Sequence, residues 1–179
     1  MNCRKPNRFK RYDYSQPGFY FVTVCPTNRV EWFGAVVDGR MALNPYGEIV
    51  QTCWDDLPNH YPNIELDVFS IMPNHVHGII KIGNGLPAPA FVTGGPGKPF
   101  PTDGKNYGLS EILRGFKTFS SRRINEKLLH DDRFQWQKSF HDHIIRNEMS
   151  LCRIREYVLN NERQWEFDKE NLEGRETKK

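Results

Sequence analysis

The chain has 179 residues, of which 37% are hydrophobic and 13% aromatic, which is enough for one domain with a core rich in rings. The formal net charge is only +3, and the four cysteines contain no Cys-x-x-Cys pair, which argues against a disulfide framework or a zinc ribbon. No run of residues approaches the length of a membrane span, and no apolar segment follows the basic N-terminus, so we expect a cytoplasmic protein.

The first half of the chain predicts a strand, a hairpin, a helix and two more strands. Residues 18–26 (GFYFVTVCP) are dense in β-branched and aromatic residues, which is typical of a central strand. Residues 31–44 indicate a hairpin with an Asp-Gly turn, and Asn44 is a suitable N-cap for a helix that ends at Pro58. Residues 64–71 predict another strand, which a Pro-Asn turn joins to the next one.

The second half predicts a long loop followed by a helix, a strand and a last helix. Residues 83–108 are rich in glycine and proline, which indicates a loop. A helix is expected to begin with Ser110 as its cap and to run to about Leu129, and residues 138–145 predict a strand. The last helix is expected over about residues 148–164, with an asparagine as its N-cap.

Without the hairpin, the predicted order of elements is βαββαβ followed by one more helix. This order is that of a ferredoxin-like fold. We therefore expect an α+β fold of the ferredoxin-like (RRM-like) class, with an antiparallel sheet, helices packed on one face and an added C-terminal helix. Residues 18–165 would form this single domain, between a basic N-terminal arm over residues 1–17 and a charged tail over residues 166–179. Many functions share this fold, so the fold alone decides little about function.

His75 and His77 lie two residues apart in the segment SIMPNHVHGII, residues 70–80. Side chains at this spacing project from the same face of a strand, so both imidazoles can bind one metal ion. An ordinary pair of half-buried histidines has the same pattern, and a short motif of this kind often matches by accident. The rest of the chain has to decide between the two interpretations.

Two clusters of basic residues are candidates for contact with a nucleic acid. One lies in the first eleven residues, and the other, RGFKTFSSRR, mixes cations with aromatic and hydroxyl residues. Cations suit the phosphates of a nucleic acid and flat rings suit its bases, although a solvated helix face can have the same composition. The candidate residues are Arg8, Lys10, Arg11, Arg114, Lys117, Arg122 and Arg123.

In the last predicted helix, Tyr157 and Asn161 lie four residues apart, and therefore on one face. A tyrosine hydroxyl can act as a covalent nucleophile, and an amide oxygen can bind a metal ion. Spacing alone does not distinguish Tyr157 from an ordinary tyrosine at the edge of the core, because the chain contains seven tyrosines.

Four segments together resemble the single-tyrosine (Y1) HUH transposases, and most of all the REP-associated tyrosine transposases. They match the opening of the family's domain, its His-hydrophobic-His strand, its basic helix, and the strand and tyrosine helix that close it, in family order over about residues 8–165. Several linked motifs are more specific than one. The segments are YDYSQPGFYFVTVCPTNR, PNHVHGII, LSEILRGFKTFSSRRIN and FQWQKSFHDHIIRNEMSLCRIREYVLNN.

The resemblance implies roles for particular residues. His75 and His77 would bind the metal ion, Tyr157 would be the nucleophile, and Asn161 would be the third ligand. The family often has Asn-Pro after the tyrosine helix, whereas here Glu162 follows, so Glu162 is an alternative third ligand.

The resemblance also implies a reaction, the cleavage and rejoining of single-stranded DNA at REP-like hairpins flanked by a short tetranucleotide. Tyr157 would attack phosphorus to give a 5′-phosphotyrosine and a free 3′-hydroxyl. Phosphate chemistry with an amide ligand suits Mg²⁺ or Mn²⁺. His141 and His143 do not match the family's metal motif, and we interpret them as structural or DNA-contacting. Monomer and homodimer are both open, and a nucleoid-associated place in the cytoplasm is expected.

Three other functions stay open at this point. A non-catalytic REP-type DNA-binding protein would use the same basic surfaces without cleaving DNA. A metal-dependent phosphodiesterase would use the histidines and not Tyr157. An RNA-recognition module is suggested by the segment GFYFVTV, but three positions depart from that module's strand motif.

Overall fold

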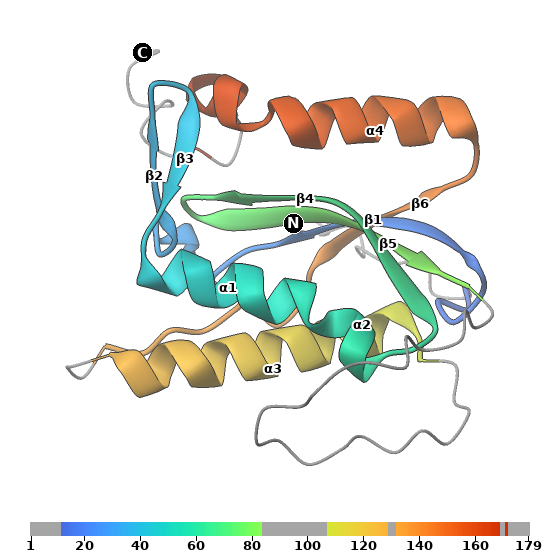
Figure 1. Ribbon diagram of the computed structural model, residues 1–179, viewed down its shortest axis with the longest axis horizontal. Coiled ribbons are helices and arrows are strands. Elements are labelled where there is room, and N and C mark those ends of the chain that lie inside the picture. The colour runs from blue at the N-terminus through green and yellow to red at the C-terminus, as the bar shows by residue number, and fades with distance from the viewer. Residues whose placement is uncertain (1–11, 84–106, 129–131, 169–170, 172–179) are drawn as a thin grey trace, which may run out of the picture.

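The computed structural model describes residues 12–83, 107–128, 132–168 and 171. Figure 1 shows one sheet between α4 on one side and α1, α2 and α3 on the other. The strands of this sheet are β1 (Gly18–Val24), β4 (Ile64–Met72), β5 (His75–Ile82) and β6 (His141–Ile145). The helices are α1 (Pro45–Asp55), α2 (Leu57–His60), α3 (Leu109–Lys127) and α4 (Glu148–Asn160).

The strand order confirms the predicted fold class. The order is β4-β5-β1-β6, and each neighbouring pair is antiparallel, as in a ferredoxin-like fold. The helices α1 and α3 pack on one face of the sheet, as expected. The added helix α4 lies on the other face, so the sheet is covered on both sides (Figure 1).

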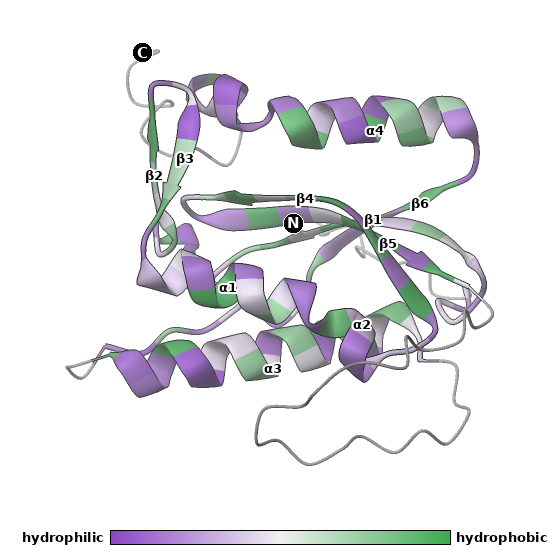
Figure 2. Cartoon of the chain, viewed as in Figure 1, coloured by the Kyte–Doolittle hydropathy of each residue, from purple (hydrophilic) through white to green (hydrophobic). Residues whose placement is uncertain are grey.

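The alternation of side chains along each strand divides the core in two. Val22 and Ile80 point towards α1 and α3 and belong to one large cluster with Trp54. Ile79 points the other way and packs against Leu151 of α4 in a smaller cluster. Figure 2 shows hydrophobic residues along much of the sheet with hydrophilic ones among them, and both kinds on the helices.

Gly78 of β5 allows the indole of Trp54 to lie directly against the sheet. The rings of Trp54 and Phe69 stack with centroids 4.3 Å apart and planes 9° apart. A Cβ atom at position 78 would overlap a ring carbon of Trp54, so a close approach of this kind needs glycine. Because Gly78 follows His77 directly, the same contact fixes the strand that holds the histidine pair.

The predicted hairpin is present and leads into α1. Its strands are β2 (Gly34–Val37) and β3 (Arg40–Leu43). Asp38 and Gly39 have φ values of 51° and 70°, and positive values at both positions are those of a type I′ turn. The side chain of Asn44 accepts main-chain hydrogen bonds from the first turn of α1, as predicted for the N-cap.

Several predicted boundaries differ from those in the structure. The first helix ends at Asp55, before Pro58, because a short helix of its own starts at Leu57 with Pro58 in its first turn. The predicted cap at Ser110 is wrong, since Gly108 occupies the N-cap of α3 and Ser110 lies inside the first turn.

The last part of the chain is also more divided than predicted. The strand expected over residues 138–145 begins only at His141. The helix expected to reach residue 164 ends at Asn160, and a 3₁₀ helix (Glu162–Phe167) follows it. The predicted cap at Asn147 is present, because its side chain accepts the N–H of Ser150 at 2.8 Å.

Some predictions lie outside the described residues. These are the candidate residues Arg8, Lys10 and Arg11, nearly all of the predicted loop over residues 83–108, and most of the predicted tail. Within the described ranges, no helix combines the length and the apolar character that a membrane span requires.

Candidate metal and tyrosine site

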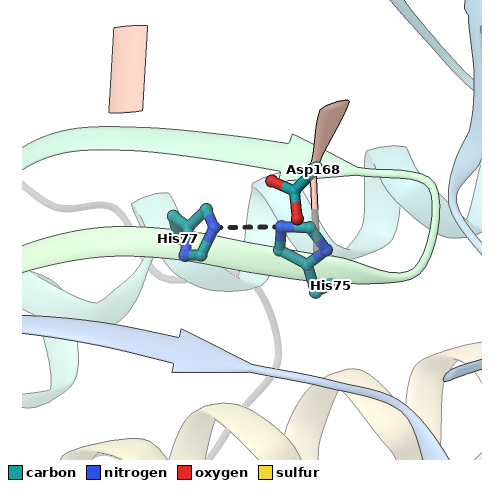
Figure 3. A group of neighbouring side chains, drawn as sticks. All are labelled: His75, His77 and Asp168. Atoms are coloured by element: carbon teal, nitrogen blue, oxygen red, sulfur yellow. Dashed lines mark hydrogen bonds between the residues drawn. The ribbon is translucent and has the colours of Figure 1, made fainter. Parts of the chain in front are cut away.

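His75 and His77 project from the α4 face of β5, as their spacing predicts. Their Nε2 atoms lie 3.0 Å apart, and both side chains are buried. Asp168 lies beside them, and one ligand atom from each of the three residues falls within 4.8 Å of the other two. Figure 3 shows the carboxylate next to the two rings. Two imidazoles and a carboxylate at this separation could hold one divalent metal ion.

The outer nitrogen of each ring has a neighbour that fixes its orientation. Nδ1 of His75 is 2.8 Å from Oδ1 of Asn74, and Nδ1 of His77 is 2.8 Å from Oγ1 of Thr23. An amide oxygen only accepts hydrogen bonds, so Nδ1 of His75 donates and its Nε2 presents a lone pair to the site. Metal-binding histidines are commonly oriented by a contact of this kind.

His75 lies in an environment that keeps its ring neutral. Burial lowers its pKa well below the usual value, and the nearby His77 and Arg29 lower it further. The ring of Trp165, in the 3₁₀ helix, lies with its centroid 6.0 Å from that of His75. A neutral imidazole is the form that binds a metal ion.

Tyr157 of α4 lies over the same site. Its hydroxyl oxygen is 3.3 Å from Nε2 of His77. The ring of Phe21 stacks on His77 with centroids 5.3 Å apart and meets the ring of Tyr157 edge-on at 6.2 Å. Tyr157 is 39% exposed, so part of the residue lies open to solvent. The structure thus brings the candidate nucleophile and the candidate metal pair together within one chain.

Asn161 and Glu162, the two candidate third ligands, have different surroundings. Asn161 is 1% exposed, and neither atom of its amide has a hydrogen-bond partner among the described residues. Glu162 accepts the main-chain N–H of Met41 at 3.0 Å, which joins the 3₁₀ helix to β3. The carboxylate in the three-residue group is therefore that of Asp168, not that of Glu162.

Sequence reasoning missed Asp168, which lies in the segment interpreted as a charged tail. Its main-chain N–H donates to the carbonyl of Trp165 at 3.1 Å, at the end of the 3₁₀ helix. This turn places the carboxylate next to His75 and His77. The available signal was the pair of aromatic residues Trp165 and Phe167 in a largely charged stretch.

The second histidine pair lies on the edge strand β6. Thr23 of β1 lies between His141 of β6 and His77 of β5. Neighbouring strands are about 5 Å apart, so His141 and His77 are separated by two such spacings. His141 and His143 are both exposed, and neither belongs to the group around His77. Their interpretation as structural or DNA-contacting residues stays a prediction.

The predicted basic residues of α3 do not share one environment. Arg114 and Lys117 line a groove between α3 and residues 133–140. Arg122 forms an ion pair with an acidic residue one turn further along the helix, and Arg123 donates to a cysteine of α1. Only part of the predicted set therefore faces a common surface.

Comparison with known proteins gives a relative and a structural neighbour, although no protein-family model matches the chain. A protein of Haemophilus influenzae, described as an uncharacterized protein, is 37% identical over an alignment of 176 positions, which covers 94% of this chain and 93% of the relative. The solved structure of a REP-associated tyrosine transposase bound to a REP hairpin has a TM-score of 0.55, with 19% identity, over 86% of this chain and 71% of that chain. The chain therefore belongs to one family with the Haemophilus influenzae protein, and its fold is that of the single-tyrosine (Y1) transposases.

Proposed function

We propose that the protein is a metal-dependent transposase that cleaves single-stranded DNA beside a REP-like hairpin and becomes covalently bound to it through Tyr157. The observation that carries this proposal is the 3.3 Å distance from the Tyr157 hydroxyl to Nε2 of His77, which itself lies 3.0 Å from Nε2 of His75. Because all three side chains belong to one chain, a monomer would hold a complete site. The fold shared with a transposase bound to a REP hairpin supports the class of substrate.

His75, His77 and Asp168 would hold a divalent cation, for which we propose Mg²⁺ or Mn²⁺. When bound, the ion would polarise the phosphodiester and stabilise the charge that develops on its oxygens. The donors suit such an ion, because the imidazoles are buried and oriented through their outer nitrogens. Asn161 is the candidate fourth donor, since its buried amide has no partner among the described residues.

In the proposed reaction, the hydroxyl oxygen of Tyr157 attacks phosphorus in line with the bond to the 3′ oxygen of the DNA. The new bond from phosphorus to tyrosine forms as the bond to the 3′ oxygen breaks. The phenol loses its proton and the 3′ oxygen gains one, which leaves a 5′-phosphotyrosine and a 3′-hydroxyl. The phosphodiester linkage is conserved, so a 3′-hydroxyl of DNA can attack it and join a new end.

Trapping of the covalent adduct tests this function. The protein is incubated with Mn²⁺ or Mg²⁺ and a hairpin oligonucleotide with single-stranded flanks, labelled at its 3′ end, and is then analysed on a denaturing gel. We expect the label to move with the wild-type protein and not with Tyr157→Phe. Binding of the hairpin should stay within about threefold in that variant, because only the nucleophilic oxygen is removed. Tyr46→Phe is the matched control and should form the adduct normally.

The outcomes of this experiment separate the other functions. An adduct of undiminished amount in Tyr157→Phe would show that another residue is the nucleophile. Hairpin binding by the wild-type protein without adduct or cleavage would indicate a DNA-binding protein without catalysis. Metal-dependent cleavage that persists in Tyr157→Phe and never leaves an adduct would indicate a phosphodiesterase.

A further inference from the structure

We infer that the ring of Phe167, the last residue of the 3₁₀ helix, stacks on an unpaired base of the DNA next to the scissile phosphate. The inference rests on the proposed function and adds a contact to the single-stranded part of the substrate. Phe167 directly precedes Asp168, whose carboxylate belongs to the candidate metal group. A base held on this ring would therefore lie close to the phosphate that Tyr157 attacks.

Phe167 is the most exposed large hydrophobic residue in the described part of the chain, at 74%. Single hydrophobic residues are often exposed on protein surfaces, so exposure alone does not indicate a contact. The position of the aromatic ones is more specific. Of the six large hydrophobic residues that are exposed in the described ranges, two are aromatic, Tyr157 and Phe167. Both lie at the candidate metal group, since the Tyr157 hydroxyl is 3.3 Å from Nε2 of His77.

The surroundings of Phe167 suit a base and not the phosphate backbone. Glu166 on one side of it is exposed, and Asp168 follows on the other. Negative side chains repel phosphates, whereas stacking of a ring on a base needs no cation. In a paired stem the bases are already stacked on one another. An exposed ring between two acidic residues therefore suits the unpaired flank of the hairpin.

The turn that carries Phe167 is ordered before any DNA binds. The carbonyl of Trp165 accepts the main-chain N–H of Asp168 at 3.1 Å and the side-chain amide of Asn171 at 3.0 Å. Three residues make one turn of a 3₁₀ helix, so Trp165 and Phe167 project in different directions. The ring of Trp165 lies with its centroid 6.0 Å from that of His75, which ties the helix to the site. A ring on an ordered turn loses little conformational freedom when it binds a base.

The 3₁₀ helix is also fastened at its other end. Glu162, its first residue, accepts the N–H of Met41 in β3 at 3.0 Å. Figure 1 shows this short helix directly after α4 and beside the hairpin of β2 and β3. Because both ends are held, removal of the exposed ring of Phe167 should leave the position of the helix unchanged. Phe167 is therefore a better probe than Trp165, whose loss would disturb the metal group itself.

The test combines removal of the ring with removal of single bases, in the Tyr157→Phe background, so that binding is measured without cleavage. Fluorescence anisotropy gives the affinity for a hairpin with single-stranded flanks and for a series of oligonucleotides with one abasic position each. With Phe167 present, one abasic position should weaken binding about tenfold. Phe167→Ala should weaken binding of the intact oligonucleotide by a similar factor, and the same abasic position should then weaken it by less than about twofold.

Met149→Ala is the matched control. Met149 is 66% exposed and lies about two helical turns before Tyr157 on α4. This variant should bind the intact oligonucleotide normally and keep the full effect of the abasic position. Phe167→Tyr should behave in the same way, because it keeps an aromatic ring. Titration of Mn²⁺ without DNA should give equal affinities for Phe167→Ala and wild type, which shows that the loss does not arise at the metal group.

Three results would overturn the inference. They are an unchanged affinity of Phe167→Ala for the hairpin, an equal loss in Met149→Ala, and abasic effects that are the same with and without the ring at every flank position. Phe167→Leu repeats the measurement if the alanine variant unfolds, as judged by circular dichroism. Failure of the proposed function would look different, because the protein with Tyr157 would then form no adduct although one flank base still depended on Phe167 for binding.

Discussion

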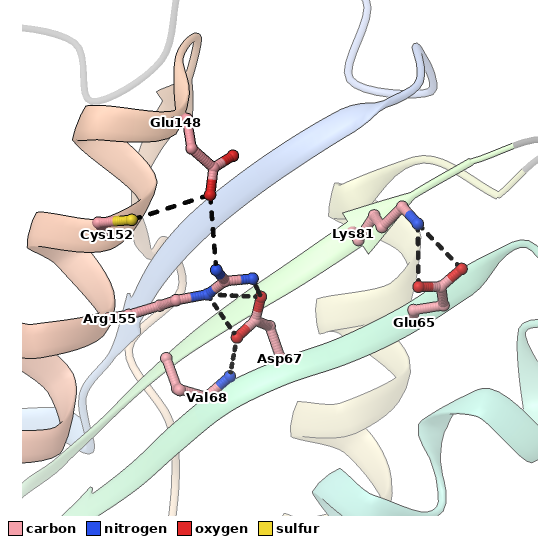
Figure 4. Close-up of polar contacts among 7 residues, drawn as sticks. All are labelled: Glu65, Asp67, Val68, Lys81, Glu148, Cys152 and Arg155. Carbon is pink, nitrogen blue, oxygen red and sulfur yellow. Dashed lines mark hydrogen bonds and ion pairs between the residues drawn. The ribbon is translucent and has the colours of Figure 1, made fainter.

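Arg155 of α4 holds Asp67 of β4 with three hydrogen bonds of 2.6 to 3.1 Å (Figure 4). Asp67 lies at a β-bulge, where the register shifts between Leu66 and Phe69, and such a bulge can redirect a side chain. Arg155 and Tyr157 are two residues apart on the helix, so they lie on different flanks of it. The ion pair therefore fixes the rotation of α4, and with it the direction of the Tyr157 hydroxyl.

Arg155→Ala should slow formation of the covalent adduct more than it destabilises the fold. The guanidinium side chain is 37% exposed, so we expect the loss of the pair to lower the free energy of unfolding by only about 1 kcal/mol. A displacement of about 1 Å at the reacting atoms can slow a reaction about 100-fold. The rate of adduct formation measures the effect on positioning, and urea unfolding measures the effect on stability. Arg155→Lys should restore the rate only in part, because lysine keeps the charge but cannot form the bidentate contact.

The ion pair between Lys81 and Glu65 provides the control. It joins β5 to β4 at 3.0 Å, and Figure 4 draws no hydrogen bond or ion pair from it to α4. Lys81→Ala should leave the adduct rate unchanged. Equal slowing in Lys81→Ala and Arg155→Ala, or slowing that the unfolded fraction explains completely, would argue against a positioning role for Arg155.

Asp67 also makes the stability of the protein sensitive to acid. Partial burial raises the pKa of its carboxyl group, but the hydrogen bonds from Arg155 and from the N–H of Val68 outweigh burial, and the net pKa is below the usual 3.8. The unfolded chain therefore binds the proton more readily. The carboxylate contributes its full stabilisation above about pH 4, and this contribution is lost as the pH falls below that value.

Asp67→Asn tests this dependence. The variant should be less stable than wild type at pH 7, and the difference between them should shrink below about pH 4. Urea unfolding between neutral pH and pH 3 measures both proteins under the same conditions. A difference that stays constant over the whole range would show that Asp67 does not titrate as described.

The strands and the histidine pair could be predicted because their signals are local. Alternation of side chains places His75 and His77 on one face of β5 whatever packs above them. The Asp38-Gly39 turn likewise needs only two residues that tolerate positive φ. The order of such elements was then enough for the fold class, since few topologies accommodate βαββαβ.

The remaining features depend on contacts between distant segments. Asp168 reaches the histidines through a short 3₁₀ helix, and so short an element carries no clear hydrophobic period. Arg114 and Arg122 are indistinguishable in the sequence, yet only Arg114 faces the groove, because residues 133–140 pack beside its side of α3. Glu162 likewise becomes a partner of the hairpin only in the folded chain.

Gly78→Ala should destabilise the protein by about 1–3 kcal/mol, because the new methyl group would push Trp54 away from the sheet. Gly83 is the matched control, since a Cβ atom there meets nothing within 4 Å. Gly83→Ala should change stability by less than about 1 kcal/mol. Urea unfolding compares the two variants. If both variants lost the same stability, the contact with Trp54 would not explain the effect.

The next prediction concerns the donor that would complete the proposed metal site. Asp168→Asn should weaken Mn²⁺ binding about tenfold or more, because a charged ligand is replaced by a neutral one beside His75 and His77. Glu162→Ala should leave Mn²⁺ affinity unchanged and should lower stability by about 1 kcal/mol, since Glu162 accepts the N–H of Met41. Calorimetric titration of the metal ion, without DNA, measures the affinities independently of catalysis.

Asn161→Ala separates metal binding from positioning of the nucleophile. Asn161 follows α4 directly, so an ion that it helped to bind would also fix the end of the helix that carries Tyr157. The variant should bind Mn²⁺ only a few-fold more weakly, a loss of about 1 kcal/mol of binding free energy, because the histidines and Asp168 remain. Its adduct rate at saturating metal should nevertheless fall about tenfold or more, since small displacements of a nucleophile are strongly felt in the rate. A normal adduct rate in Asn161→Ala, together with loss of metal binding in Glu162→Ala, would transfer the role to the glutamate.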